Sequence, residues 1–334
     1  MSIKNEKYYE ELLMNIDILK LNDKQSHNVI EIKKIGSGGF GKVIGGNYFN
    51  LPIAIKKMKN FNYEAFYKEI NMIRLFRHPF IPRFYFINGH PVSLNMVQEL
   101  IKGRNLDDYI KKIKPTDIQI VVHMLDLAIV LNHLHNYNMI HRDLKPSNIM
   151  IDDKLDVKLL DFGISKITQN RSFTTTLAIG TILYMAPENF DTDFLSGQTM
   201  NDTSSSKITG RVDVWAFGCM LSEIFSKSKP WTPLAKDDTS VISHLYCKSK
   251  FPIPEKIDRS KYGKLVTLIE RCTLLNECER YNFYMVIRSL RDLLLDLILE
   301  RMNTFNDEHK YLNAQSSKPK LNKSIHFYVK YRNI

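Results

Sequence analysis

The sequence has 334 residues, with 44% hydrophobic and 25% charged residues and a formal net charge of +11. These values are ordinary for a globular protein that buries a core, and they exclude a fibrous or wholly disordered chain. Much of the positive charge lies near the C-terminus, because no acidic residue follows Glu308 while six lysine and arginine residues do. We expect a solvated basic tail over residues 299–334, with a tail that docks on lipid or protein as the alternative.

Residues 1–28 are an N-terminal extension with closely spaced charges and no apolar stretch of the secretory type. The repeat of Leu12, Leu13, Ile16 and Leu19 predicts an amphipathic helix there. The four cysteines lack C-x-x-C spacing, which is typical of free thiols in a reducing compartment. No uninterrupted apolar run reaches membrane-spanning length. We therefore expect a cytoplasmic protein without an integral membrane segment, with the nucleus as the alternative location.

Residues 29–101 predict a small sheet with one helix. Runs rich in β-branched residues flank a glycine cluster and recur at 51–59, 81–87 and 94–100. Between them, residues 64–76 have helical spacing and stop before His78-Pro79, as a helix does before proline.

After residue 102 the pattern changes to helix. Residues 118–135 are apolar nearly all round, which predicts a helix buried in a larger domain. Residues 191–207 are polar and predict a loop insertion. The other elements that we expect are a strand pair at 149–151 and 157–160 and helices over 213–226, 264–275 and 285–302.

The segment Gly36–Val43 reads G-x-G-x-x-G-x-V, a spacing that lets backbone N–H groups approach phosphates. Dinucleotide-binding folds share the spacing, but there a helix would begin at the third glycine. Here Val43-Ile44 continues as a strand, and a second strand follows and ends at Lys56. A lysine that ends a buried strand needs an anion to meet its ammonium, although a surface lysine is the alternative interpretation.

Three further motifs follow in order: HRDLKPSN at 141–148, DFG at 161–163 and APE at 186–188. With the glycine segment and Lys56, this set resembles the eukaryotic protein kinase family over about residues 29–298. The resemblance implies an α+β bilobal kinase fold, with a sheet lobe at 29–101 and a mainly helical lobe at 102–298. It also implies ATP and Mg²⁺ as cofactors and proteins as substrates.

The resemblance assigns roles to the catalytic residues. Asp143 orients the substrate hydroxyl and accepts its proton, and Lys145 lies over the transferring phosphate. Asn148 and Asp161 hold magnesium, because their oxygens are the hard ligands that this ion prefers.

Lys56 is expected to pair with the ATP phosphates and with a glutamate of the following helix. Glu69 fits that place by its distance from the proline, and Glu64 is the alternative. The interval between Lys56 and Glu69 is short for the family, which predicts a truncated loop before the helix.

The nucleotide pocket implied by the resemblance has Val43 and Ala54 as its roof, Met150 as its floor and Gln98 as the gatekeeper. Glu99, Leu100 and Ile101 form the hinge that meets the adenine. The complete set of nucleotide-binding residues that we predict is Ile35, Gly36, Ser37, Gly38, Gly39, Phe40, Gly41, Lys42, Val43, Ala54, Lys56, Gln98, Glu99, Ile101 and Met150.

Other matches to the family are structural. Asp213 is expected to anchor the catalytic loop, and Glu188 to pair with Arg280. Tyr281 follows that arginine where the family commonly has proline. A stacked core across both lobes is expected from Ile73, Phe84, His141 and Phe162.

Lys145-Pro146 and the Gly180-Thr181 pair resemble serine/threonine kinases, and several features are similar to the tyrosine-kinase-like group. Dual specificity is the alternative. We hypothesise that one of Thr174–Thr176 is an activating phosphosite that pairs with Arg142 and is the target of autophosphorylation or of an upstream kinase. An unmodified polar loop is the alternative.

Functions of other classes find less support. A kinase-shaped binding scaffold usually lacks one of the catalytic residues, whereas Lys56, Asp143, Asn148 and Asp161 are all present. A nucleic-acid partner would rest on the basic tail alone, and we do not expect one. We expect a monomer.

Overall fold

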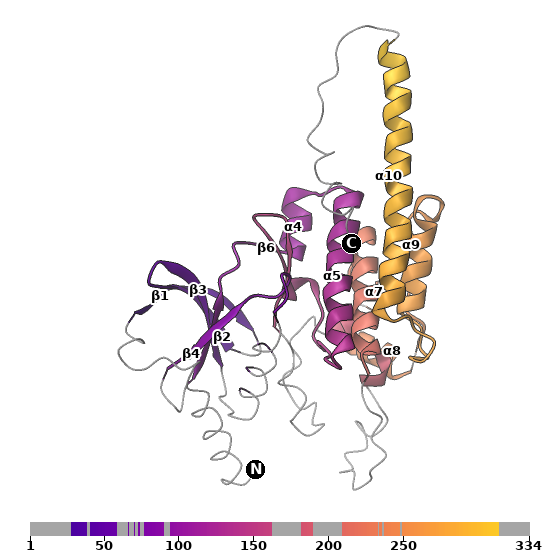
Figure 1. Ribbon diagram of the computed structural model, residues 1–334. Helices are drawn as coiled ribbons and strands as arrows, with labels where there is room; N and C mark the ends of the chain where they lie inside the picture. Colours follow the sequence, from indigo (N-terminus) through magenta and orange to yellow (C-terminus); the bar gives the residue numbers. More distant parts are fainter. Residues whose placement is uncertain are drawn as a thin grey trace.

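The computed structural model describes residues 28–38, 41–58, 66, 70, 73, 77–89, 94–161, 182–189, 209–232, 234–235, 237–247 and 249–313. They form a sheet lobe and a larger helical lobe side by side, as Figure 1 shows. The α+β bilobal fold expected from the kinase resemblance is therefore confirmed.

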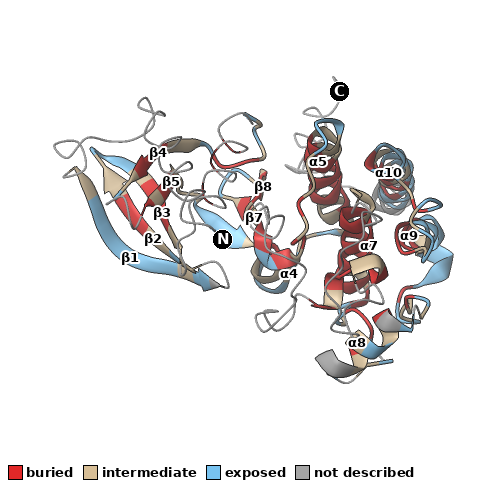
Figure 2. Cartoon of the chain, turned by 90° about the horizontal axis from the view of Figure 1, so that it is seen from below, coloured by how far each residue is buried: buried red, intermediate tan, exposed pale blue. Residues whose placement is uncertain are grey.

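The sheet lobe has five antiparallel strands in the order β1-β2-β3-β5-β4. The central strand β3 carries four consecutive buried residues, Ile53 to Lys56, because other strands and core residues cover it. The edge strand β1 is largely exposed (Figure 2). The strand bounds are β1 Val29–Gly38, β2 Gly41–Tyr48, β3 Leu51–Met58, β4 Phe84–Asn88 and β5 Asn95–Glu99.

Two predictions for this lobe can be compared with the structure. Phe66, Ile70 and Ile73 are helical and buried, which agrees with the helical spacing of residues 64–76. Strand β4 begins at Phe84, later than the expected residue 81. Pro82 explains the delay, because proline has no N–H to give to a ladder.

The helical lobe is built around α5 (Asp117–Asn136) and α7 (Arg211–Ser226), which are both buried on most sides. Thr116 caps α5 in a reciprocal hydrogen-bonded arrangement with Gln119, which satisfies N–H groups at the helix start. Within the described residues, α5 alone has the length and composition of a membrane span, and its apolar sides lie inside the lobe.

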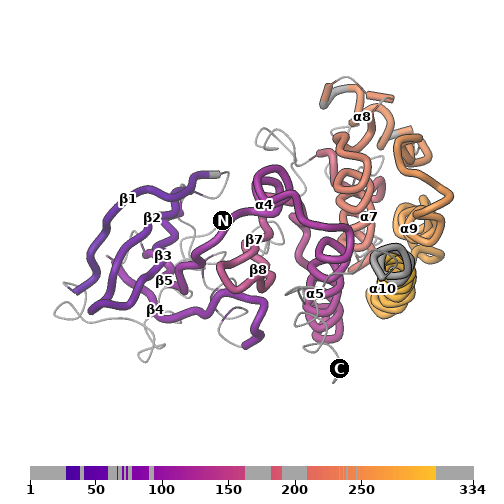
Figure 3. Tube along the Cα trace, turned by 90° about the horizontal axis from the view of Figure 1, so that it is seen from above, coloured from indigo at the N-terminus to yellow at the C-terminus, as the bar shows by residue number. Residues whose placement is uncertain are grey.

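The outer helices of this lobe are α8 (Asp238–Tyr246), α9 (Arg259–Cys272) and α10 (Phe283–Asn313). Figure 3 shows α9 and α10 on the side of the lobe away from the sheet. Helix α10 contacts α5 and α9, and it runs eleven residues beyond the end expected from the sequence.

A small second sheet lies between the lobes, with the order β6-β7-β8. Its strands are β6 (Gly103–Asn105), β7 (Ile149–Asp152) and β8 (Val157–Leu159), and the last two confirm the predicted pair. The sequence analysis missed β6, α4 (Leu106–Ile113) and α8. Cap residues mark both helices: the Asn105 side chain accepts from Asp108 N–H, and Asp237 accepts from Ser240 N–H.

An ion pair joins the segment 182–189 to the base of α10. Both guanidinium nitrogens of Arg280 bind the Glu188 carboxylate, at 2.6 and 3.1 Å, as the sequence predicted. The Arg280 side chain is fully buried, and its remaining N–H groups donate to the carbonyls of Leu274 and Arg211. It also lies over the Trp215 ring. Every donor of this buried cation is thereby used.

Replacing Glu188 by alanine removes the anion and leaves the Arg280 guanidinium buried. We expect the free energy of unfolding to fall by about 3 kcal/mol, because a buried charge without its partner is strongly destabilising. Urea unfolding followed by tryptophan fluorescence measures this, since Trp215 contacts the arginine. As a control, Lys264→Ala removes a half-exposed pair with Asp296 and should change stability by less than about 1 kcal/mol. Equal effects of the two substitutions would contradict this account.

Candidate active site

The carboxylate of Asp213, on the first turn of α7, holds the backbone of the catalytic loop. It accepts the N–H groups of His141 and Arg142, each at 2.8 Å. His135, near the end of α5, binds the same carboxylate through Nε2 at 2.8 Å. Burial alone would raise the pKa of Asp213, but the hydrogen bond and charge of His135 and the N–H of His141 lower it. The carboxylate is therefore anionic in the folded protein at neutral pH.

The same loop is tied to the segment that leads to Asp161. Nδ1 of His141 accepts from the N–H of Asp143, so Nε2 carries the proton and donates to the Leu160 carbonyl at 2.9 Å. The Leu160 N–H donates to the Asn148 carbonyl at 2.8 Å. Both backbone groups of Leu160 thus bind the catalytic loop, and they fix where the next residue, Asp161, begins.

The Asp143 carboxylate lies in the centre of the loop and is almost fully buried. Nζ of Lys145 donates to its two oxygens at 2.9 and 3.1 Å. Nδ2 of Asn148 donates to the same carboxylate at 3.1 Å and to the Asp143 backbone carbonyl at 2.7 Å. These bonds orient the carboxylate and leave the amide oxygen of Asn148 as the atom suited to a cation.

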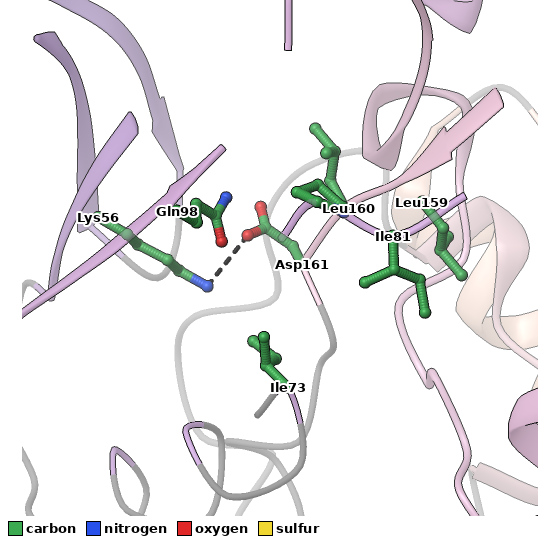
Figure 4. Close-up of a pocket in the computed structure, with 8 residues that line it drawn as sticks. Lys56, Ile73, Ile81, Gln98, Leu159, Leu160 and Asp161 are labelled. Carbon is green, nitrogen blue, oxygen red and sulfur yellow. Dashed lines mark ion pairs between the residues drawn. The ribbon is translucent and has the colours of Figure 1, made fainter. Parts of the chain in front are cut away.

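Lys56 crosses from the sheet lobe to the helical lobe. Its ammonium lies 3.0 Å from Oδ1 of Asp161, and the lysine side chain is 6% exposed (Figure 4). Gln98 of β5 and Ile73 line the pocket beside this ion pair. A buried lysine would be costly in an apolar strand, and the carboxylate offsets that cost.

Two residues of the site have positive backbone φ angles, which are uncommon for residues other than glycine. The φ angle of Arg142 is 66° and that of Asp161 is 49°. Such conformations are strained by about 1–3 kcal/mol and persist where the surroundings hold them. Here Asp213 holds Arg142, and the bonds to Leu160 hold the residue before Asp161.

Comparison with known proteins bears on what this arrangement does. A model of the protein kinase domain matches residues 29–290. The chain belongs to the protein kinase domain family.

Several curated kinases are similar to the chain. The probable serine/threonine-protein kinase kinX of Dictyostelium discoideum is 30% identical over 78% of this chain and 23% of its own length. The dual specificity protein kinase shkC of the same organism is 30% identical over 80% of the chain and 52% of its own length. The serine/threonine-protein kinase STY17 of Arabidopsis thaliana is 28% identical, with coverages of 79% and 44%. The chain thus spans about a quarter to a half of these relatives.

The predicted nucleotide-binding residues of the kinase come from adjacent strands. Val43 of β2 lies opposite Lys56 of β3, and Ala54 lies opposite Gln98 of β5. Met150 lies in β7 of the small sheet. Ile35 to Gly38 end β1, and Gly41 and Lys42 begin β2, so the predicted glycine segment joins two paired strands. Gly39, Phe40 and the predicted partner glutamate Glu69 lie outside the described residues.

The hinge region carries contacts that the sequence did not indicate. The side chain of Glu99 accepts from the N–H of Arg83 at 3.1 Å, and Nζ of Lys158 lies 3.9 Å from it. Ile101 follows β5 and is half-buried. The Glu99 side chain therefore contacts Arg83 and Lys158, and its N–H donates to the Arg83 carbonyl at 2.8 Å, so neither group is left for the predicted adenine contact.

The sequence did not predict that His135 also forms a hydrogen bond with Asp213. His135 has no motif around it, and it reaches Asp213 only because α5 and α7 pack side by side. A contact of the segment 182–189 was missed as well. Tyr184 donates its hydroxyl to Glu223 of α7, which also binds Lys229. Burial and the Glu223 charge raise the pKa of Tyr184, so its hydroxyl stays protonated.

Of the predicted stacked core, Ile73 and His141 are buried and Phe84 packs against the main core. Phe162 lies outside the described residues. The assignment of these four residues as one continuous stack remains a prediction.

Asp213→Asn keeps the side-chain shape but replaces one acceptor oxygen by an N–H₂ donor that faces other donors. We expect the free energy of unfolding at pH 7 to fall by about 3 kcal/mol, because hydrogen bonds to a buried charge are lost. The folded-state pKa of Asp213 is lowered. Its contribution is therefore present above the unfolded pKa of about 4 and is lost as the pH falls through the folded pKa.

The measurement is urea unfolding of both proteins at several pH values between about 3 and 7, a range that includes the unfolded pKa of the carboxyl group. The stability gap between the wild type and Asp213→Asn should narrow as the pH decreases. A gap that stays constant down to acid pH would mean that the carboxylate charge is not what holds the loop.

Proposed function

We propose that the protein transfers the γ-phosphoryl group of ATP to serine and threonine hydroxyls of protein substrates, in a signalling role. One observation carries this proposal: Asp143, Asn148 and Asp161 belong to one hydrogen-bonded unit, and Lys56 meets that unit from the sheet lobe. Phosphoryl transfer needs such a set, because positioning and charge supply most of its catalysis. The kinship with serine/threonine kinases supports the same activity.

Asp143 is suited to orient and deprotonate the attacking hydroxyl. Its carboxylate is nearly buried, and Lys145 and Asn148 donate hydrogen bonds to it. Those two donors hold the carboxylate in one orientation. Lys145 is the more exposed partner of the pair, so its ammonium can also meet an incoming phosphate.

The site has the donors that Mg²⁺ and ATP require. The Asp161 carboxylate is about one-third exposed, and the oxygen of Asn148 is held by the bonds of its own amide nitrogen. Both are oxygen ligands of the kind that magnesium prefers. Bound magnesium would neutralise the charge of the phosphates. Lys56 would hold the phosphates themselves, in a place where its ammonium now meets Asp161.

The test is transfer of radiolabelled phosphate from Mg-ATP to casein and myelin basic protein, followed by phosphoamino-acid analysis. We expect Asp143→Asn and Lys56→Met each to lower the rate by about 100-fold or more, because each removes a group needed in the transition state. Lys57→Met is the matched control, since Lys57 follows Lys56 in β3 but is partly exposed and pairs with Glu31. It should keep nearly full activity.

The identity of the labelled residue separates the classes of kinase. Label on serine or threonine supports the proposal, whereas label on tyrosine as well would indicate dual specificity, as in the name of the relative shkC. Transfer that survives in Asp143→Asn would contradict the role of Asp143. ATP binding without any transfer would favour a scaffold or a kinase that awaits an activator.

We further propose that an upstream kinase, or the protein itself, phosphorylates one of Thr174–Thr176. These threonines lie outside the described residues, and the argument rests on Arg142. Within the described part of the chain, Nε of Arg142 is buried and has no hydrogen-bond partner. Burial lowers the pKa of Arg142, although the charge of Asp213 opposes this. An added phosphate would satisfy the guanidinium.

The corresponding test replaces all three threonines by alanine. We expect kinase activity to fall by about tenfold, because the phosphate that orders the site is lost. Mass spectrometry of the wild type should find phosphate on at least one of the three. Full activity of the triple variant would refute the proposal.

A further inference from the structure

Strand β8 is fastened to the sheet lobe as well as to the catalytic loop. It forms an edge of the small sheet, and the Leu159 N–H donates to the carbonyl of Phe80 at 2.7 Å. Ile81 of the same segment lines one pocket together with Leu159 and Asp161 (Figure 4). The chain is therefore bound to the sheet lobe two residues before it reaches Asp161.

Lys158, the central residue of β8, binds two further groups of the sheet lobe. Its ammonium donates to the Pro79 carbonyl at 2.8 Å and lies 3.9 Å from Oε1 of Glu99. The lysine side chain is only 13% exposed, and an ammonium with so little water needs such partners. Glu99 is itself joined to Arg83 by its side chain and by its own N–H. The cation of β8 thus meets the hinge and the segment 79–83 together.

The position of Lys158 in the small sheet places it beside the predicted adenine pocket. It lies opposite Met150 of β7, and residues directly opposite each other in a ladder share one face of the sheet. Met150 is the predicted floor of that pocket. Three residues after Lys158 the chain reaches Asp161, the predicted magnesium ligand. Strand β8 therefore connects the two places that the adenine and the phosphates of ATP would occupy.

We propose that Lys158 is a positioning residue for the nucleotide, because it fixes the spacing between the hinge and Asp161. This inference rests on the proposed phosphotransfer function and adds a residue to it. A nucleotide that spans both places binds well only when they are held at the matching distance. A site that also adopts other distances binds in proportion to its competent fraction. Lys158 acts through Glu99 and β8 rather than through contact with the nucleotide.

The exposure of Glu99 separates this role from one in overall stability. Its side chain is 35% exposed, so the ion pair with Lys158 adds little to the free energy of unfolding. The partners of Lys158 nevertheless belong to the hinge and to the segment 79–83, which are parts of the sheet lobe. Loss of the ammonium should therefore change the nucleotide site more than it changes the melting temperature.

The test is steady-state kinetics of the full chain, with Mg-ATP varied at fixed casein and casein varied at fixed Mg-ATP. Lys158→Met keeps the apolar stem and removes the ammonium. We expect the KM for ATP to rise about fivefold, because the competent fraction of sites falls to about one-fifth. The kcat and the KM for casein should each change by less than about twofold, since saturating ATP restores the competent state.

Lys154→Met is the matched control, because Lys154 is an exposed lysine in the turn between β7 and β8. It should leave the KM for ATP unchanged. Lys158→Arg should recover part of the ATP affinity, since it retains the charge and can donate to the same carbonyl. A variant that is merely less well folded would lower kcat and leave the KM for ATP as it was. That pattern, or an equal rise of KM in both methionine variants, would overturn the inference.

A binding titration distinguishes failure of this inference from failure of the proposed function. Calorimetry with Mg²⁺ and the non-hydrolysable ATP analogue AMP-PNP requires no phosphoryl transfer. Lys158→Met and Glu99→Gln should each weaken binding, and the double variant should bind no more weakly than Lys158→Met alone, because both changes remove the same contact. Additive losses, or unchanged binding in Lys158→Met, would overturn the inference even if the kinase is active. If the wild type binds the analogue but transfers no phosphate, the proposed function fails while the titration still decides the role of Lys158. A wild type that binds no nucleotide would overturn both.

Discussion

The buried carboxylate of Asp213 is the point on which the catalytic loop depends. A lone anion in this core would be costly, but three donors from the loop and from α5 meet it. Two of those donors are consecutive backbone N–H groups, and the second belongs to Arg142, whose backbone is in the left-handed region. The energy of ion–dipole bonding therefore stabilises a strained turn. Asp143 takes its place from that turn, so the position of the catalytic carboxylate is set by the packing of α5 on α7.

The second constraint links the lobes. Strand β3 is buried on both sides and ends its buried run with Lys56, whose ammonium meets Asp161. Asp161 in turn follows Leu160. The N–H and the carbonyl of Leu160 both form hydrogen bonds to the catalytic loop. A chain of contacts thus runs from the sheet to Asp213. Nucleotide phosphates and magnesium would enter at the Lys56–Asp161 pair, where the positive and negative partners that they require already lie together.

An ion pair to the buried Arg280 and a buried hydrogen bond also secure the segment 182–189. Glu188 is held by Arg280, and Tyr184 is held by Glu223 and through it by Lys229. These contacts join the segment around residues 182–189 to α7 and to the start of α10. The first half of helix α10 supports the lobe, and its second half extends beyond the lobe. The division falls at Leu297, where contact with the lobe ends.

Much of the fold and the site could be predicted from the sequence, because short-range patterns carry that information. Alternating and helical apolar periods determined the strands of the sheet lobe and the cores of α5, α7, α9 and α10. The order of glycine, lysine and aspartate motifs determined the family and the catalytic residues. Asp213 and the Glu188–Arg280 pair were also predicted, through the resemblance. The short β6, α4 and α8 were missed because a few residues carry too little periodicity to be recognised.

Contacts between distant segments were decided only by the tertiary structure. No local pattern distinguishes His135 as a ligand of Asp213, since the two are 78 residues apart and meet through helix packing. The same holds for the bonds from Leu160 to the catalytic loop. Leu297 and Leu299 are identical in chemistry and two residues apart, yet one is 5% and the other 57% exposed. Sequence determined that α10 is apolar and helical, whereas the extent of the neighbouring helices decided which of its leucines are buried and which face water.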